Sequence, residues 1–219
     1  MATHIQIEGG GHRIGAWQGE PDGAPKGGLV VIQEIFGVNA HIRRVVDGFA
    51  KDGYRVIAPA FFDLVRPDVE LDYDEQGIKE GIALAGQVQF EPVIELVKAA
   101  ADTLSSAGKV GVVGYCWGGT VAYLSAIRLG LPAVSYYGGG NTRFVDEPVK
   151  APVMFHYGQL DQHITAADRD RVRQANPDAE FFVYPADHGF NCDVRASHDE
   201  VSAALARRRT LDFFARHLT

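Results

Sequence analysis

Short apolar runs alternate with helical patterns along most of this sequence, and this alternation constrains the fold more than any other feature. The run Gly28–Ile32 is continuous and rich in β-branched residues, which is typical of a strand covered on both faces. Asn39 can cap the helix that follows, in which apolar residues recur at helical spacing from Ile42 to Phe49. Strands that alternate with helices predict an α/β fold with a mainly parallel sheet flanked by helices. We expect further strands at Tyr54–Ala58, Lys109–Val113, Ala133–Tyr137, Pro152–His156 and Phe181–Tyr184, and helices at Thr120–Leu129, Ala166–Ala175 and 199–217.

Two segments depart from this alternation. Residues 4–7 and 12–18 alternate in hydrophobicity around Gly9–Gly11, which predicts an antiparallel hairpin near the N-terminus. Residues 66–108 form a longer and largely helical connection, which could shape a pocket. Because the sequence shows no internal repeat and no shift in composition, we expect residues 1–219 to form a single domain.

Charge and hydropathy exclude several classes of partner. The 219 residues include 21 Lys and Arg against 28 Asp and Glu, a net charge of −7, so the basic surface that binds nucleic acid or anionic membranes is missing. The apolar stretches are far shorter than the roughly 20 residues of a membrane-spanning helix. The first residues lack the basic and apolar regions of a signal peptide. We therefore expect a cytoplasmic monomer or small homo-oligomer whose partner is a small molecule.

Metal and cofactor motifs are also missing. The two cysteines, Cys116 and Cys192, are too few for a disulfide framework and stand in no zinc-binding spacing. The sequence has no P-loop, no H-E-x-x-H and no G-x-G-x-x-G after a strand. We expect no metal and no cofactor, and chemistry carried by side chains.

The segment Gly114-Tyr-Cys-Trp-Gly118 has the nucleophile-elbow pattern G-x-S-x-G with cysteine in place of serine. It follows a predicted strand and precedes a predicted helix, as an elbow does. Both glycines are needed because side chains there would collide with backbone in the tight turn. The positive end of the following helix favours a thiolate at Cys116, which makes it the candidate nucleophile. The alternative is a small buried hydrophobe in a glycine-rich turn.

A nucleophile of this type needs a base and an orienting carboxylate, which follow it in the order acid, then histidine. Asp161 lies just past one predicted strand and His188 just past the next, where functional groups gather in parallel sheets. His163 is the main competitor for His188, but it is too close in sequence to Asp161 to face that carboxylate. Asp187 adjoins His188 and is badly placed to orient it, and a plain turn role remains the alternative for Asp161.

The remaining histidines are expected to have structural or solvent-exposed roles. His156 lies inside a predicted strand and is expected to be a satisfied core or rim residue. The others lie on the predicted hairpin or helices, where a solvated surface position is expected: His4, His12, His41, His198 and His217.

Several motifs together resemble the dienelactone hydrolase family. They are Val31-Ile-Gln-Glu-Ile-Phe-Gly-Val-Asn39, Arg55-Val-Ile-Ala-Pro59 with Phe62-Asp63, Gly114-Tyr-Cys-Trp-Gly-Gly119, Tyr136-Tyr-Gly-Gly139, the loop with Gly158 and Asp161, and His188-Gly-Phe-Asn-Cys192. The resemblance covers nearly the whole chain. It implies an α/β-hydrolase fold, a Cys-Asp-His triad, and esterase or lactonase activity, with carboxymethylenebutenolidase as the founding activity.

The resemblance also directs attention to Glu34, just after the Gly28–Ile32 strand. It implies that the backbone N–H groups of Ile35 and Trp117 hold the developing oxyanion. Glu34 could contact the thiol as a second carboxylate near the nucleophile. Alternatively, it bonds to nearby backbone or to an arginine such as Arg43 or Arg44.

The chain departs from the family pattern in its arginines. Members that act on small anionic lactones are expected to hold the substrate carboxylate with arginines, but residues 67–108 contain none. Arg195 could reach the pocket or pair with Asp193, and Cys192 is expected to pack in the core. The aromatic residues Trp117, Phe36, Phe62 and Phe190 could wall a pocket for an apolar substrate or pack in the core.

The sequence therefore predicts a hydrolase of carboxylic esters or lactones that works through an acyl-enzyme. Two alternatives remain open. One is a non-hydrolytic protein on the same scaffold that binds a small molecule or senses oxidants through Cys116. The other is a thioesterase.

Overall fold

A computed structural model describes residues 2–218. Eight strands form one sheet in the order β1-β2-β4-β3-β5-β6-β7-β8. The strands are β1 (Thr3–Gly9), β2 (His12–Gly19), β3 (Gly28–Ile32), β4 (Arg55–Pro59), β5 (Val110–Tyr115), β6 (Ala133–Tyr136), β7 (Val153–Gly158) and β8 (Glu180–Tyr184). The α-helices are α1 (Ala40–Lys51), α2 (Glu75–Ala85), α3 (Phe90–Leu104), α4 (Trp117–Arg128), α5 (Ala166–Ala175) and α6 (Glu200–His217). Short 3₁₀ turns are η1 (Phe61–Leu64), η2 (Ser105–Ala107) and η3 (Asn141–Arg143).

Six strands, from β4 to β8 in the sheet order, run parallel, and the N-terminal hairpin joins them antiparallel through β2. This arrangement confirms the predicted α/β fold with a mainly parallel sheet and a hairpin at one edge. Strands β3 and β5 are buried at every residue, because helices cover both faces of the sheet there. The connection at 66–108 is largely helical as predicted, and it consists chiefly of α2 and α3.

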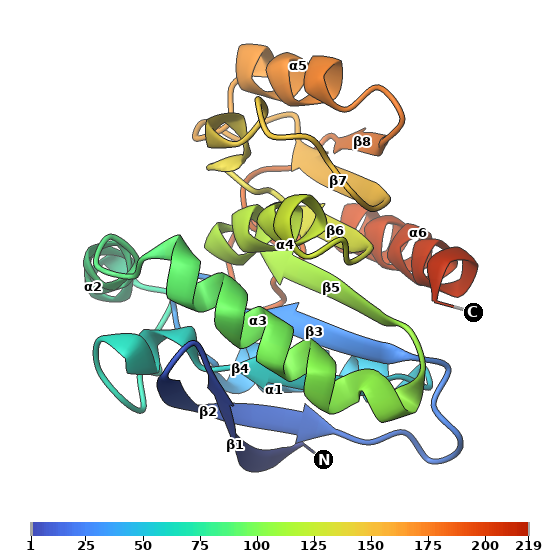
Figure 1. The fold of residues 1–219 in the computed structure, drawn as a ribbon. Helices are drawn as coiled ribbons and strands as arrows, with labels where there is room; N and C mark the ends of the chain where they lie inside the picture. Colours follow the sequence, from blue (N-terminus) through green and yellow to red (C-terminus); the bar gives the residue numbers. More distant parts are fainter. Residues whose placement is uncertain (1, 219) are drawn as a thin grey trace.

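Helices cover the sheet on both sides (Figure 1). In that view α3 and α4 lie in front of the sheet, whereas α1 and α6 lie behind it. The start of α1 shows why the sequence folds this way. The Asn39 side chain accepts hydrogen bonds from the N–H groups of His41 and Ile42, and the helix turns Ile42, Val46 and Phe49 into the core.

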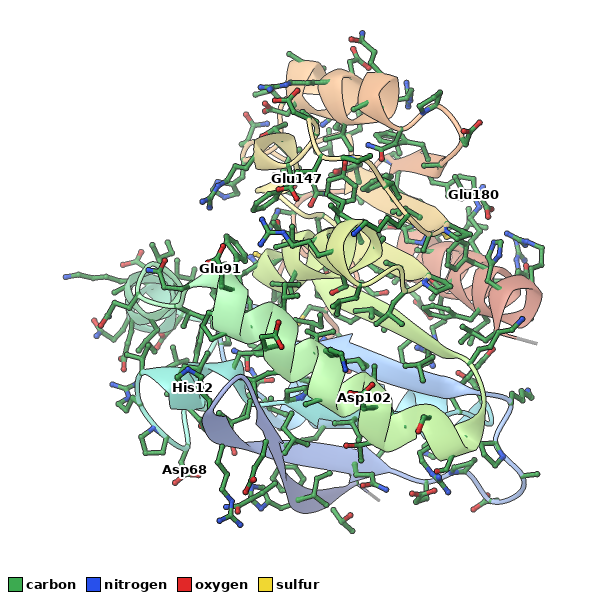
Figure 2. The ribbon with its side chains drawn as sticks, in the orientation of Figure 1. His12, Asp68, Glu91, Asp102, Glu147 and Glu180 are labelled. Atoms are coloured by element: carbon green, nitrogen blue, oxygen red, sulfur yellow. The ribbon has the colours of Figure 1, made fainter. Side chains whose placement is uncertain are left out.

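Charged side chains lie mostly on the outside of these layers. Figure 2 shows Glu91 and Asp102, both exposed, on the outer side of α3. No helix within residues 2–218 is both long and apolar enough to cross a membrane.

Two sequence predictions need correction. The helix predicted at Thr120–Leu129 begins three residues earlier, at Trp117, because its first turn starts directly at the glycine-rich elbow. His41, expected at a solvated surface, is only 5% exposed. Its position near the start of α1 points it inward, where its Nδ1 lies 2.8 Å from Asp193 Oδ1.

The carboxyl ends of the parallel strands share one edge of the sheet. The chain leaves β3 for β4 on one side and later returns to β5 on the other side, so β3 and β5 flank the point where the winding direction reverses. Crevices at such reversal points are the usual ligand sites of open α/β sheets. Glu34 follows β3 and Cys116 follows β5, so both lie at this edge.

Candidate active site

Cys116 lies in a strained turn between β5 and α4. Its backbone has φ 55° and ψ −116°, a conformation that L-residues rarely adopt outside constrained sites. A Cβ added to Gly114 would lie 1.9 Å from the Gly118 carbonyl oxygen, and one added to Gly118 would lie 2.3 Å from the Gln33 carbonyl oxygen. Both glycines are therefore required by close backbone approach, as the sequence predicts for an elbow.

Asp161 and His188 meet beside this turn, although 27 residues separate them in the sequence. His188 Nδ1 lies 2.7 Å from Asp161 Oδ2, and the other oxygen of Asp161 accepts a 2.8 Å hydrogen bond from the His163 backbone N–H. The Cys116 side chain lies near the same imidazole and helps to raise its pKa. The structure therefore brings sulfur, imidazole and carboxylate together at one point of the sheet edge.

The charges of these groups stabilise one another. Burial would lower the pKa of His188, but the charge of Cys116 and the hydrogen bond to Asp161 outweigh burial and raise it to about 10. Burial likewise opposes ionisation of Asp161, but the hydrogen bond from His188 and its charge hold the pKa of Asp161 below its ordinary value. At neutral pH His188 is therefore protonated beside the ionised carboxylate of Asp161.

The other histidines differ clearly from His188. His163 contributes its backbone N–H to Asp161, and its exposed ring lies 5.4 Å from the ring of His188. His156 is fully buried, with its ring nitrogens 2.8 Å from the Tyr184 hydroxyl and 3.1 Å from Thr210 Oγ1. Burial lowers the pKa of His156 to about 3, so it is the neutral core residue that the sequence predicted.

The expected oxyanion donors both lie at the edge where Cys116 emerges. Trp117 is the first residue of α4, and the first N–H groups of a helix have no acceptor within it. Ile35 lies in the turn after β3, and α2 packs against its carbonyl so closely that Gly81 has no room for a Cβ. The role of the two N–H groups remains a prediction.

Glu34 is fully buried and has partners other than those suggested by the sequence. Its Oε2 accepts a 3.0 Å hydrogen bond from the Tyr73 hydroxyl, and its Oε1 lies 3.6 Å from Arg195 Nη1. Arg43 pairs instead with Glu70, and Arg44 pairs with Asp193.

Arg195 therefore faces Glu34, and Asp193 has other partners. Burial would lower the pKa of Arg195, but Glu34 raises it above its ordinary value, so the guanidinium remains charged. Tyr73 was not singled out from the sequence, because a lone tyrosine in a helical connection carries no motif.

The aromatic residues divide into two groups. Phe36, Phe62 and Phe190 are at most 1% exposed and are core residues, whereas Trp117 is half-buried. A pocket of about 370 Å³ lies beside Trp117 and is lined also by Arg143. Sequence reasoning missed Arg143, which contacts the aromatic rings of this pocket from the turn after β6.

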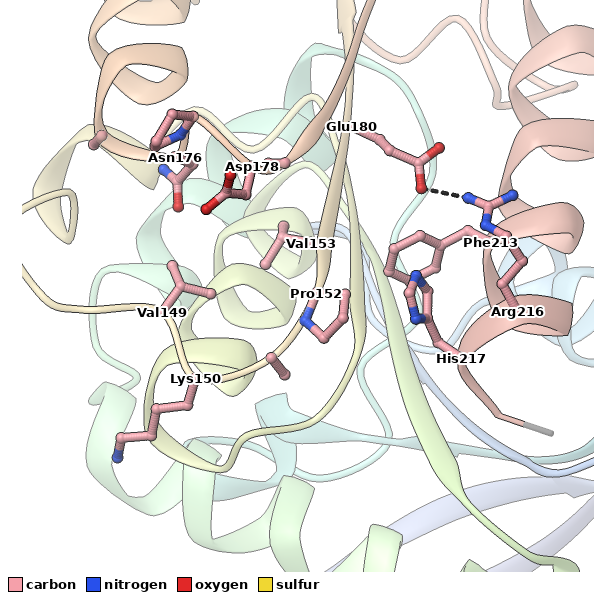
Figure 3. A pocket seen from close by; sticks show the side chains of 14 residues that line it. Val149, Lys150, Pro152, Val153, Asn176, Asp178, Glu180, Phe213, Arg216 and His217 are labelled. Atoms are coloured by element: carbon pink, nitrogen blue, oxygen red, sulfur yellow. Dashed lines mark hydrogen bonds and ion pairs between the residues drawn. The ribbon is translucent and has the colours of Figure 1, made fainter.

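A second pocket lies at the opposite, amino-terminal edge of β7 (Figure 3). It has a volume of about 690 Å³, and Glu180 and Arg216 form an ion pair at its wall. Val153 and His217 also line it. None of its lining residues belongs to the predicted site, so this hollow is separate from the Cys116 edge.

Comparison with known proteins agrees with this geometry. The model of the dienelactone hydrolase family matches residues 14–218. The chain belongs to the dienelactone hydrolase family. A carboxymethylenebutenolidase of Pseudomonas putida is 35% identical over 217 residues, covering 94% of this chain and 92% of the relative.

Solved structures also resemble this member of the dienelactone hydrolase family. A Klebsiella pneumoniae protein with the provisional name dienelactone hydrolase superimposes with a TM-score of 0.85 at 32% identity, over 99% of this chain and 98% of that one. A dienelactone hydrolase-like promiscuous phosphotriesterase from metagenomic libraries has a TM-score of 0.74 at 20% identity, over 100% and 99%. The second likeness shows the shared fold alone.

Proposed function

We propose that this protein hydrolyses a carboxylic ester or lactone through Cys116, His188 and Asp161. Membership of the dienelactone hydrolase family makes the chain a hydrolase of this class. The observation that supports the triad is the position of His188, whose ring is bonded to Asp161 and lies near Cys116. A nucleophile, a base and an orienting group in that order are the elements of covalent acyl transfer.

The first half of the reaction forms a thioester. The Cys116 sulfur attacks the carbonyl carbon, and the carbonyl oxygen becomes an oxyanion held by the N–H groups of Ile35 and Trp117. His188 then donates its proton to the leaving alkoxide as the bond between carbon and that oxygen breaks. Asp161 keeps the imidazole ring oriented and stabilises its charged form throughout.

The second half restores the enzyme. His188, now neutral, takes a proton from a water molecule that attacks the thioester carbonyl. The second tetrahedral intermediate collapses, the carbon–sulfur bond breaks, and the product acid leaves. Cys116 and His188 return to the thiolate and imidazolium pair.

Arg143 lines the pocket beside Trp117, where its guanidinium lies over the rings of Phe90 and Phe144, and the other arginines near the site favour a neutral substrate over an anionic one. Residues 67–108 offer no arginine, and the charge of Arg195 is already balanced by Glu34 at 3.6 Å. We therefore expect a substrate carboxylate to gain little from Arg195. A preference for a carboxylated lactone over its neutral methyl ester would contradict this part of the proposal.

Rapid mixing with 4-nitrophenyl acetate tests the reaction itself. We expect wild-type protein to release a burst of 4-nitrophenol equal to the enzyme concentration, followed by steady turnover. Cys116→Ala should show neither the burst nor turnover above the uncatalysed rate. If Cys116→Ala hydrolyses the ester as fast as wild type, the proposal is wrong. Peroxide-driven sulfenic acid at Cys116 without any turnover would favour the sensing alternative.

A further inference from the structure

A second cluster of reactive side chains lies beside the triad and takes no part in the proposed reaction. Glu34 follows β3, His41 lies in the first turn of α1, and Cys192 lies in the loop between β8 and α6. One ligand atom from each lies within 4.8 Å of the other two. We propose that Glu34, His41 and Cys192 form a binding site for a thiophilic divalent cation of the Zn²⁺ class.

Two buried polar atoms in this cluster are left without hydrogen-bond partners among the described residues. They are Nε2 of His41 and Oε1 of Glu34, in residues that are 5% and 0% exposed. Buried polar groups normally find a partner, because removing them from water otherwise costs free energy. Imidazole nitrogen, carboxylate oxygen and thiolate sulfur are the ligands that zinc takes in proteins, and this cluster offers one of each.

The tautomer of His41 supports the same conclusion. Its Nδ1 lies 2.8 Å from Asp193 Oδ1, and that oxygen also accepts a 3.0 Å hydrogen bond from Arg44. A carboxylate accepts hydrogen bonds, so in the neutral ring Nδ1 carries the proton and Nε2 is the atom with a lone pair for a cation. A carboxylate that fixes a histidine in this way is the usual outer partner of a zinc-bound imidazole.

The distances leave room for a cation after small adjustments. Ligand atoms in a tetrahedral zinc site lie about 2.0 to 2.3 Å from the ion, so they are about 3.3 to 3.8 Å from one another. The present ligand atoms lie within 4.8 Å of one another, so they would need to approach by at most about 1.5 Å to bind one ion. Glu34 Oε1 makes no hydrogen bond to a described residue and lies 3.6 Å from Arg195 Nη1, so a cation would compete for this oxygen with that ion pair.

The cluster also has a route from solvent. A surface pocket of about 230 Å³ is lined by His41, Tyr73 and Val194, so it reaches one proposed ligand directly. A bound cation would tie together three segments that surround the active site: the turn after β3, the start of α1 and the loop after β8. We therefore expect it to stabilise the fold of these segments.

Binding of Co²⁺ to chelator-treated protein is the test, because thiolate-bound Co²⁺ gives a charge-transfer absorption that oxygen and nitrogen ligands do not. We expect one equivalent of Co²⁺ to produce this band in wild type and Zn²⁺ to displace it. Cys192→Ser should abolish the band. His41→Gln should weaken binding at least about 100-fold, and Asp193→Asn about 10- to 100-fold, as loss of an outer partner does.

Three controls separate this site from the triad and from misfolding. Cys116→Ser should keep the band, whereas loss of the band there would place the metal on the catalytic thiol and overturn the proposal. His12→Gln changes an exposed histidine of β2 and should leave the affinity for Co²⁺ unchanged.

Thermal unfolding without metal shows whether each variant is folded. Added Zn²⁺ should raise the midpoint of thermal unfolding of wild type and Cys116→Ser but not of Cys192→Ser. If wild type gives neither a band nor a stabilised midpoint, the proposal is wrong.

Discussion

The two cysteines of this protein lie in surroundings that are alike in composition and different in geometry. Each lies near a histidine whose Nδ1 bonds to an aspartate, at 2.7 Å for His188 with Asp161 and at 2.8 Å for His41 with Asp193. Cys116, however, is half-buried at a strained elbow, whereas Cys192 is fully buried in a loop.

The difference shows that residue types alone do not make a nucleophile. Cys116 directly precedes α4, and its interaction with His188 helps to raise the pKa of that imidazole. Burial raises the pKa of Cys192 to about 12, with Glu34 adding to the effect, so its thiol stays protonated. A thiolate is the reactive form, so Cys192 without a bound cation is not prepared for attack on a carbonyl.

Removal of each thiol in turn should give the largest contrast. Cys116→Ala deletes the proposed nucleophile, and we expect turnover of an activated ester to fall by about 10³-fold or more, since the residues of such a triad act as a unit. The fold-loss of activity in Cys192→Ala should be at least about 100 times smaller than that in Cys116→Ala, because the Cys192 sulfur touches no reacting atom. Steady-state kinetics in metal-free buffer measure both variants. Equal losses of activity in the two variants would show that the two cysteines do not differ in their role in the reaction.

The aspartates give the next largest contrast. Asp161→Asn keeps the shape of the side chain but no longer stabilises the imidazolium of His188, so kcat should fall by about 10²- to 10⁴-fold. Asp193→Asn should alter kcat far less, because Asp193 contacts His41 and Arg44 instead. Circular dichroism of both variants would exclude unfolding as the cause. A similar fall in both would mean that Asp161 acts only through the fold.

Much of this contrast could be predicted from the sequence, for identifiable physical reasons. The elbow at Cys116 was predictable because steric demands fix its glycines at set positions. The positions of His188 and Asp161 were predictable because the carboxyl ends of parallel strands lie at one edge of the sheet. The partners of Glu34 and the burial of His41 were not predictable. They depend on how α1 and the loop after β8 pack together, which no local pattern encodes.

The alkylation rates of the two cysteines should differ directly, although by less than the activities of the variants. Iodoacetamide reacts with accessible thiolates, so we expect Cys116 to be modified at least about 100 times faster than Cys192 in the folded protein. Peptide mass spectrometry after timed quenching gives the two rates. In denaturant the rates should converge, since burial and the helix end no longer act. Comparable rates in the folded state would show that Cys192 is accessible.

The pH dependence should give the smallest effect and the finest test of the His188 environment. The pKa of His188 is raised to about 10, so its proton is present throughout the neutral range and is lost as pH rises through that value. An alkyl ester needs this proton for its leaving group, so kcat/KM should fall above about pH 10 after the uncatalysed rate is subtracted. Asp161→Asn removes a group that raises this pKa, so its fall should begin at lower pH. A 4-nitrophenyl ester, whose leaving group needs no proton, should show a weaker fall. An identical fall for both esters would mean that the high-pH limb reports some group other than His188.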